Sequence, residues 1–181
     1  GTSDGTPTEK QTYKDIEAVY DWALRLKGLV KDPAKEIILY GQSVGSGPSC
    51  YLGTKRSVKG LILHSGILSG IRVLTPSRML CCFDIFPNID RIKKMKCKVF
   101  VIHGENDEEV PVAHGYQLHT LTPDIYKYEP WFVKNRGHND IWHENDGQSQ
   151  QFIYTLTSLQ FSRLKSLNSY LSPLASLTSQ N

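Results

Sequence analysis

The sequence lacks most features that would point to a membrane or a nucleic acid. No apolar run approaches the roughly 20 residues of a transmembrane helix. No basic run is interleaved with aromatic residues, and the net charge of +3 is too small to indicate a polyanionic partner. The first residues resemble neither a signal peptide nor a targeting segment. With 39% hydrophobic and 22% charged residues, the 181 residues predict one globular domain of the soluble type.

Motifs for metals, phosphates and disulfides are missing as well. There is no Cys-x-x-Cys pair and no His-Glu-x-x-His, and no Gly-Lys-Ser/Thr follows the glycine-rich residues 41–49. His103-x-Glu105 is like the start of a zinc deaminase signature, but no Pro-Cys-x-x-Cys follows. We therefore expect no metal and no cofactor, and free thiols in a reducing compartment. The four cysteines are Cys50, Cys81, Cys82 and Cys97.

One stretch, residues 37–45, has the layout of a nucleophile elbow. An apolar run meets the pentad Gly41-Gln42-Ser43-Val44-Gly45, and residues that can start a helix follow. This order predicts a sharp strand-to-helix turn that exposes the Ser43 hydroxyl. Glycine is expected at 41 and 45 because side chains there would collide where strand and helix cross. The Val44 N–H would stabilise developing negative charge from a helix N-terminus, as an oxyanion donor.

Hydrophobic periodicity predicts an α/β fold with a mostly parallel sheet flanked by helices. Residues 65–96 are apolar without a clean period, which predicts loops or short helices that cover the site. We expect the domain to span residues 1–165 and the tail, 166–181, to be disordered. The predicted helices are 10–26, 44–54, 112–121 and 147–167, and the predicted strands are 36–40, 59–64, 98–103 and 129–133.

The order of reactive residues predicts a serine hydrolase. In α/β-hydrolases the nucleophile is followed by an acid and then by a histidine, and reactive groups collect at the carboxyl ends of the strands. His138 follows the last predicted strand. An imidazole can take the proton of a serine, and a carboxylate can fix the imidazole tautomer. Order and position alone leave the acid open among four residues of one loop: Glu105, Asp107, Glu108 and Glu109.

Several stretches in the same order resemble the alpha/beta hydrolase domain-containing protein 17 group, serine hydrolases of the α/β-hydrolase fold. The resemblance runs from residue 1 to about residue 155. It rests on Tyr-Lys-Asp-Ile-Glu-Ala (13–18), Ile-Ile-Leu-Tyr-Gly-Gln-Ser-Val-Gly (37–45), Leu-His-Ser (63–65), Ser-Gly-Ile-Arg-Val (69–73), Phe-Asp-Ile-Phe-Pro-Asn-Ile (83–89), Val-Ile-His-Gly-Glu-Asn-Asp-Glu-Glu-Val (101–110) and Gly-His-Asn-Asp (137–140).

The resemblance implies roles for single residues and a reaction. It makes Ser43 the nucleophile, Asp107 the acid and His138 the base. The group consists of palmitoyl-protein thioesterases, so it implies S-acylated proteins as substrates and a cytoplasmic enzyme peripheral to membranes, attached through an N-terminal cysteine cluster that this sequence lacks. We hypothesise that apolar side chains of residues 65–90 accommodate the acyl chain, with Ile67, Leu68, Leu74 and Phe83 as candidates.

The sequence also departs from the group. Residues 1–5 resemble the turn after the fourth strand, so we expect this chain to be the C-terminal part of the fold, without the upstream strands or the loop that gives the second oxyanion donor. Gly66-Ile67 stands where the group has Pro-Leu. Two alternatives stay open: a lipase, carboxylesterase or serine peptidase of the same fold, or an inactive truncated interaction module.

Overall fold

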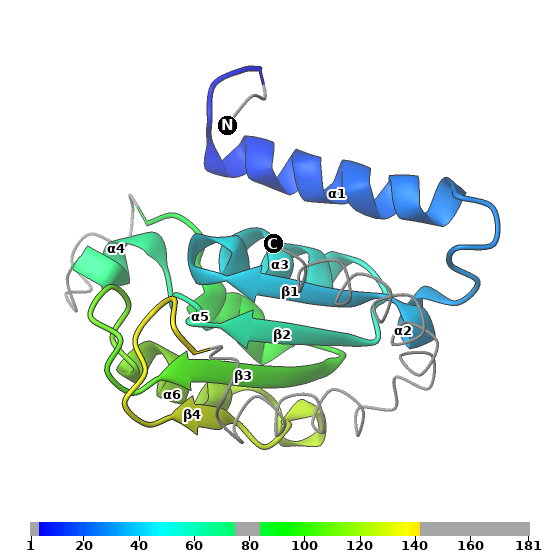
Figure 1. Cartoon of the computed structure of the whole chain (residues 1–181). Coiled ribbons are helices and arrows are strands. Elements are labelled where there is room, and N and C mark those ends of the chain that lie inside the picture. The colour runs from blue at the N-terminus through cyan, green and yellow to red at the C-terminus, as the bar shows by residue number, and fades with distance from the viewer. Residues whose placement is uncertain (1–3, 75–83, 142–181) are drawn as a thin grey trace, which may run out of the picture. The chain divides into compact units, whose positions relative to one another are not determined.

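The computed structural model describes residues 4–74 and 84–141. Its elements alternate between helices and strands along the chain (Figure 1). In order they are α1 (Glu9–Arg25), α2 (Pro33–Glu36), β1 (Ile38–Gln42), the 3-10 turn η1 (Ser43–Gly45), α3 (Ser46–Lys55), β2 (Gly60–His64), α4 (Gly70–Leu74), α5 (Asn88–Arg91), η3 (Ile92–Lys94), β3 (Lys98–Gly104), α6 (Ala113–Leu121), η4 (Asp124–Tyr126) and β4 (Trp131–Val133).

The four strands form one parallel sheet in the order β1-β2-β3-β4. Gln42 at the end of β1 is in register with His64, and His64 is in register with Ile102 of β3. The carboxyl ends of the strands therefore meet at one edge of the sheet, on the left of Figure 1. Loops that leave this edge can bring side chains from distant parts of the sequence together.

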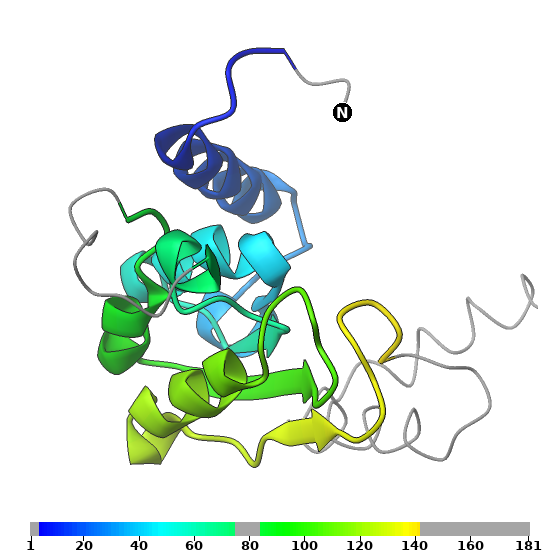
Figure 2. The same ribbon diagram turned by 90° about the vertical axis from the view of Figure 1, so that its left-hand side faces the viewer.

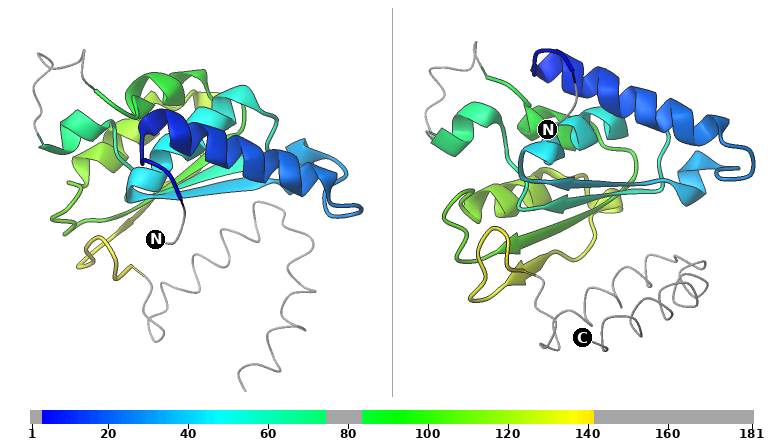
Figure 3. Two further views of the ribbon diagram at one scale, coloured as in Figure 1. Left: turned by 90° about the horizontal axis from the view of Figure 1, so that it is seen from above. Right: turned by 45° about the horizontal axis from the view of Figure 1, so that its top comes forward.

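Helices α3, α5 and α6 lie on one side of the sheet, and α1 packs outside against α3 (Figure 3). The central strands β2 and β3 are buried along almost their whole length, which matches their continuous apolar sequences. The core between sheet and helices contains Leu61, Leu63, Val99 and Val101 with side chains from the helices and connections. This packing gives the strand ends a rigid base.

The predicted helices 10–26, 44–54 and 112–121 and the four predicted strands are confirmed with small shifts. The helix after the elbow begins with the 3-10 turn η1 and becomes regular at Ser46. The short helix α2, which was not predicted, begins at Pro33, and the Asp32 carboxylate caps its first turn. Residues 65–96 contain the short helices α4, α5 and η3. The predicted final helix, 147–167, and the tail lie outside the described residues.

Across residues 4–74 and 84–141, no helix combines the length and the hydropathy needed to cross a bilayer.

The two buried cysteines that the structure describes, Cys50 and Cys97, are free thiols. Cys50 packs inside α3, where burial raises the pKa of its thiol to about 12. Both cysteines therefore act as small apolar side chains of the core.

Candidate active site

The turn between β1 and α3 has the strained backbone of a nucleophile elbow. Ser43 has a φ of 49°, a left-handed conformation that is uncommon for a residue other than glycine. A Cβ added to Gly41 would lie 2.8 Å from the Gly45 carbonyl oxygen and 2.8 Å from the Ser46 Cα. Gly41 is therefore required by the close crossing of strand and helix, as expected.

Gly45 does not meet the same expectation. A Cβ added there would have no atom within 4 Å among the described residues, and the residue has an ordinary right-handed conformation with φ −62°. The steric reason given for this second glycine is therefore wrong: its carbonyl oxygen faces Gly41, but its own Cβ position faces open space. The Val44 side chain, next to it, is 58% exposed.

A network of buried hydrogen bonds stabilises the elbow. The Ser46 hydroxyl donates to the Ser43 carbonyl oxygen at 2.6 Å and accepts from the Ile67 N–H at 3.1 Å. The Asn88 amide donates to the Ser46 hydroxyl at 3.2 Å and to the Ile67 carbonyl at 2.9 Å. Ser46 and Asn88 are completely buried. The network thus ties the turn at Ser43 to the connection after β2 and to α5, which restrains the backbone of the serine.

Asp107 lies buried in the loop after β3. One carboxylate oxygen accepts from the N–H groups of Glu109 and Val110 at 3.0 and 2.8 Å. The other lies 2.8 Å from His138 Nδ1 and 3.2 Å from His103 Nε2. Burial alone would raise the pKa of Asp107, but the Val110 N–H and the His138 imidazole hold that pKa below its ordinary value. Asp107 is therefore an ionised carboxylate aimed at His138.

His138 is buried in the loop after β4, and its Nδ1 must donate to the Asp107 carboxylate. This bond leaves Nε2 without a proton in the neutral ring, which is the tautomer that a general base needs. The loop approaches β3 so closely that a Cβ on Gly104 would lie 2.3 Å from the carbonyl oxygens of Arg136 and Gly137. Gly104 therefore permits the contact between the two loops, which lie side by side in Figure 2.

Asn139 connects the histidine loop to the elbow and to the acidic loop. Its Oδ1 accepts from Gln42 Nε2 at 3.3 Å, and its Nδ2 donates to Glu109 Oε1 at 3.2 Å. Gln42 immediately precedes Ser43, and Asn139 immediately follows His138. The structure thus brings together the three loops that carry Ser43, Asp107 and His138 at the carboxyl edge of the sheet. Asp107 orients His138, but the hydrogen bonds of the described residues include none between Ser43 and His138, so that contact stays a prediction.

Two further histidines support the cluster at the strand ends. His64 Nδ1 lies 2.5 Å from the Tyr40 hydroxyl, and burial, together with the charges of His138 and His103, lowers the pKa of His64 to about 4. His103 donates from Nε2 to the Val110 carbonyl at 2.8 Å, and burial lowers its pKa as well. Both rings are therefore neutral near pH 7.

His114 has a structural role that the sequence analysis missed. Its Nδ1 accepts from the Leu68 N–H at 3.1 Å, and its Nε2 lies 3.2 Å from the Arg72 carbonyl. Burial lowers its pKa, which keeps the ring neutral. His114 therefore pins the connection after β2 onto α6. The sequence offered one weak signal for this role, a histidine in a predicted helix. Nothing in the sequence indicated which backbone groups His114 would contact.

Of the four residues predicted to accommodate the acyl chain, two are buried in the core and two have no described side chain. Ile67 packs with Phe86 and Val110, and Leu68 belongs to the main core; both are almost completely buried. Leu74 ends α4, and its side chain is not described. Phe83 lies outside the described residues. Contact between these residues and a substrate stays a prediction.

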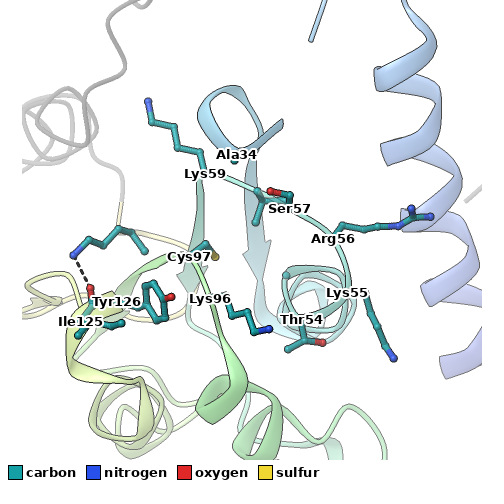
Figure 4. A pocket seen from close by; sticks show the side chains of 13 residues that line it. Ala34, Thr54, Lys55, Arg56, Ser57, Lys59, Lys96, Cys97, Ile125 and Tyr126 are labelled. Carbon is teal, nitrogen blue, oxygen red and sulfur yellow. Dashed lines mark hydrogen bonds between the residues drawn. The ribbon is translucent and has the colours of Figure 1, made fainter. Parts of the chain in front are cut away.

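A pocket of about 550 Å³ lies at the opposite edge of the sheet, at the amino ends of β2 and β3 (Figure 4). Its cationic lining residues are Lys55, Arg56, Lys59, Lys96 and Lys98. Lys98 donates to the Ile125 carbonyl at 2.8 Å, and Arg56 forms a salt bridge with Asp21. None of the lining residues belongs to the elbow, the acidic loop or the histidine loop.

Within the described ranges, no group of three or more His, Cys, Asp or Glu residues is arranged to hold a metal ion.

The chain is similar to curated proteins named for a hydrolase domain, while no protein-family model matches it. Alpha/beta hydrolase domain-containing protein 17C of Homo sapiens is 43% identical over 142 residues, which are 78% of this chain and 42% of that protein. Alpha/beta hydrolase domain-containing protein aho-3 of Caenorhabditis elegans is 39% identical over 142 residues, 78% of this chain and 41% of that protein. The chain thus spans less than half the length of these relatives.

Solved structures of low sequence identity share the fold. Est1E from Butyrivibrio proteoclasticus, solved with ferulic acid, has a TM-score of 0.64 and 17% identity, and the match covers 87% of this chain and 74% of that chain. The monoacylglycerol lipase of Paleococcus ferrophilus has a TM-score of 0.59 and 14% identity, covering 88% and 76%. The parallel sheet, the helices beside it and these comparisons together show that the chain has the α/β-hydrolase fold and resembles the alpha/beta hydrolase domain-containing protein 17 group.

Proposed function

We propose that the protein is a serine hydrolase in which Ser43 is the nucleophile, His138 the general base and Asp107 the residue that orients it. The observation that carries this proposal is the 2.8 Å contact between Asp107 and His138, on loops tied to the turn that holds Ser43 in a left-handed conformation. Of the other three carboxylates of the loop, Glu105 and Glu108 have no contact with His138 among the described residues, and Glu109 lies 3.9 Å from Nε2, not beside Nδ1.

The proposed reaction is acyl transfer to water in two steps. Ser43 Oγ attacks the acyl carbonyl carbon while its proton moves to His138 Nε2. The Val44 N–H, at the start of the helix, stabilises the oxyanion that develops. The bond to the leaving group breaks as that group receives the proton from Nε2. Water then attacks the acyl-serine, with His138 again as the base, and releases the carboxylic acid.

We further propose that the substrate is a fatty acyl thioester of a protein cysteine. The resemblance of the matched stretches to palmitoyl-protein thioesterases supports this choice. S-acylated proteins lie at membranes, so the proposal includes peripheral membrane association. The triad itself does not select a sulfur or an oxygen leaving atom, so hydrolysis of oxyesters is the second candidate, supported by the esterase and lipase fold neighbours.

Rates on matched substrates test the proposed function. Palmitoyl thioester and palmitoyl oxyester of the same leaving-group skeleton are offered to the protein and to Ser43→Ala. A thioesterase gives a higher kcat/KM on the thioester than the intrinsic reactivity of the two esters explains, and Ser43→Ala hydrolyses neither. A preference for the oxyester would support the esterase alternative. Equal slow rates for the protein and for Ser43→Ala would contradict a serine hydrolase.

A further inference from the structure

Glu109 places a carboxylate beside the nitrogen of His138 that the reaction uses. Its Oε2 lies 3.9 Å from His138 Nε2, and its Oε1 accepts from Asn139 Nδ2 at 3.2 Å. Asn139 in turn accepts from Gln42, the residue before Ser43. The Glu109 carboxylate is therefore tethered between the histidine loop and the elbow, on the side of the imidazole that faces away from Asp107.

The Glu109 carboxylate is accessible to solvent and can interact with a bound ligand. The Glu109 side chain is 65% exposed. No lysine or arginine in the part of the chain that the structure describes lies within 4.0 Å of it, and its near neighbours are the His138 ring and the Asn139 amide. Glu109 therefore presents a carboxylate beside His138 Nε2 that no lysine or arginine of the described residues neutralises.

During acyl transfer, the leaving group of the substrate is the part that lies next to the Glu109 carboxylate. His138 Nε2 must reach the leaving atom by a hydrogen bond of about 3 Å to deliver its proton. A group attached to the leaving atom then lies within a few ångströms of Glu109. In the proposed thioester reaction this group is the peptide that surrounds the acylated cysteine. Positive charge on it is attracted by Glu109, and negative charge is repelled.

We propose that Glu109 is a specificity-determining residue that favours acyl donors with a positively charged leaving group, such as a cysteine flanked by lysine or arginine. The inference rests on the proposed function, because it assigns a leaving group to the same site. Glu109 forms no covalent bond. The thioester C–S bond breaks, the sulfur takes the proton from Nε2, and the carboxylate only attracts the cation on the departing thiol.

Three thioesters of one acyl chain test the proposal: one with thiocholine, which is cationic, one with 2-mercaptoethanol, which is neutral, and one with 2-mercaptoethanesulfonate, which is anionic. The readout is the ratio of kcat/KM for the cationic to that for the anionic substrate. Glu109→Gln is expected to lower this ratio about two- to fivefold at low salt, the range for an exposed charge pair. High salt is expected to remove the difference between the variant and the wild type.

Glu108→Gln is the matched control. It removes an exposed carboxylate one residue away without touching the contact to His138. The ratio is expected to stay at the wild-type value. A ratio that Glu109→Gln leaves unchanged, or that both variants lower equally, would overturn the inference. The neutral thioester reports whether either variant has changed the basal rate.

Choline, ethylene glycol and isethionate oxyesters of the same acyl group separate the inference from the thioesterase proposal. If thioesters are inert and the oxyesters show the Glu109-dependent ratio, the leaving-group preference stands and the thioesterase assignment fails. If thioesters are hydrolysed with no effect of Glu109→Gln, the thioesterase assignment stands and the preference fails. If neither series is hydrolysed, both are overturned.

Discussion

The two edges of the parallel sheet differ in what their loops hold. At the carboxyl edge and in the connections that leave it lie all four non-glycine residues with positive φ that the structure describes: Ser43, Ser65, Phe86 and Asn135. Asp107 and His138 are buried there as a hydrogen-bonded pair. The amino edge carries an open pocket with cationic side chains, and none of its lining residues has a positive φ.

The difference shows which edge of the sheet contains conformations and buried groups that lower the stability of the folded state. Left-handed backbone and buried polar groups each cost on the order of 1–3 kcal/mol and persist only where the surroundings enforce them. Asn88 Oδ1 and His103 Nδ1, both close to the candidate site, are buried without a hydrogen-bond partner among the described residues. Exposed lysines at the amino edge cost little. The carboxyl edge is therefore expected to respond strongly to substitution, and the amino edge weakly.

The largest expected effect comes from Asp107→Asn. An asparagine amide can donate to His138 Nδ1, which would leave the proton on Nε2 and remove the general base. We expect kcat to fall about 10³- to 10⁴-fold with KM changed little, as for an orienting aspartate of this kind. Steady-state kinetics on a thioester check this result. A loss below tenfold would mean that the contact at the carboxyl edge is structural.

The two glycines of the elbow provide a matched pair for stability. Gly41→Ala is expected to destabilise the protein by about 3 kcal/mol, because its Cβ meets backbone atoms that cannot move without opening the turn. Gly45→Ala is expected to change stability by less than about 0.5 kcal/mol, since it meets open space and has helical dihedrals. Urea midpoints at constant m-value measure both changes. Equal losses would contradict the account of the turn.

The buried His64 makes stability depend on pH. Its pKa is lowered from 6.5 to about 4 in the folded protein, so between these values only the unfolded state binds the proton. Stability is therefore fully present above the unfolded pKa and is lost as pH falls toward 4. The loss between pH 7 and pH 5 is about 2 kcal/mol from this residue. His64→Gln should remove that part of the slope, and an unchanged slope in urea unfolding would contradict it.

The smallest effects are expected at the amino edge. Lys55→Ala and Lys96→Ala remove cations of the pocket in Figure 4. Neither residue contacts the candidate site, so kcat/KM should stay within about twofold and stability within about 0.5 kcal/mol of the wild type. Kinetics and urea unfolding measured beside Asp107→Asn check the contrast. A tenfold loss of activity would show that the two edges are coupled.

Much of this architecture follows from local patterns. The continuous apolar runs predicted β2 and β3, and the pentad predicted the turn at Ser43 because a strand-helix crossing has few solutions. The order of Ser43, Asp107 and His138 at strand ends predicted that their loops would lie at one edge of the sheet, since parallel strands share one carboxyl edge. The structure confirms the contact of Asp107 with His138, and contact of Ser43 with His138 stays a prediction. Resemblance, and not spacing, selected Asp107 among four carboxylates.

Features that depend on long-range packing escaped prediction. The open space at Gly45 depends on the direction of α3, and the need for glycine at 104 depends on the approach of the loop after β4. His114 meets backbone groups more than forty residues away in the sequence. The bridge from Gln42 through Asn139 to Glu109 joins three loops. No local pattern encodes such contacts, because each partner is specified only after the sheet has formed.

Labelling with a fluorophosphonate probe, followed by mass spectrometry of the modified peptide, tests the central claim most directly. The protein is compared with Ser43→Ala and His138→Gln, with circular dichroism on all three. The account predicts a phosphonyl group on Ser43, no label on Ser43→Ala, and labelling of His138→Gln that is slower by at least about 100-fold in a folded protein. Label on another residue, or equal rates for the wild type and His138→Gln, would contradict it.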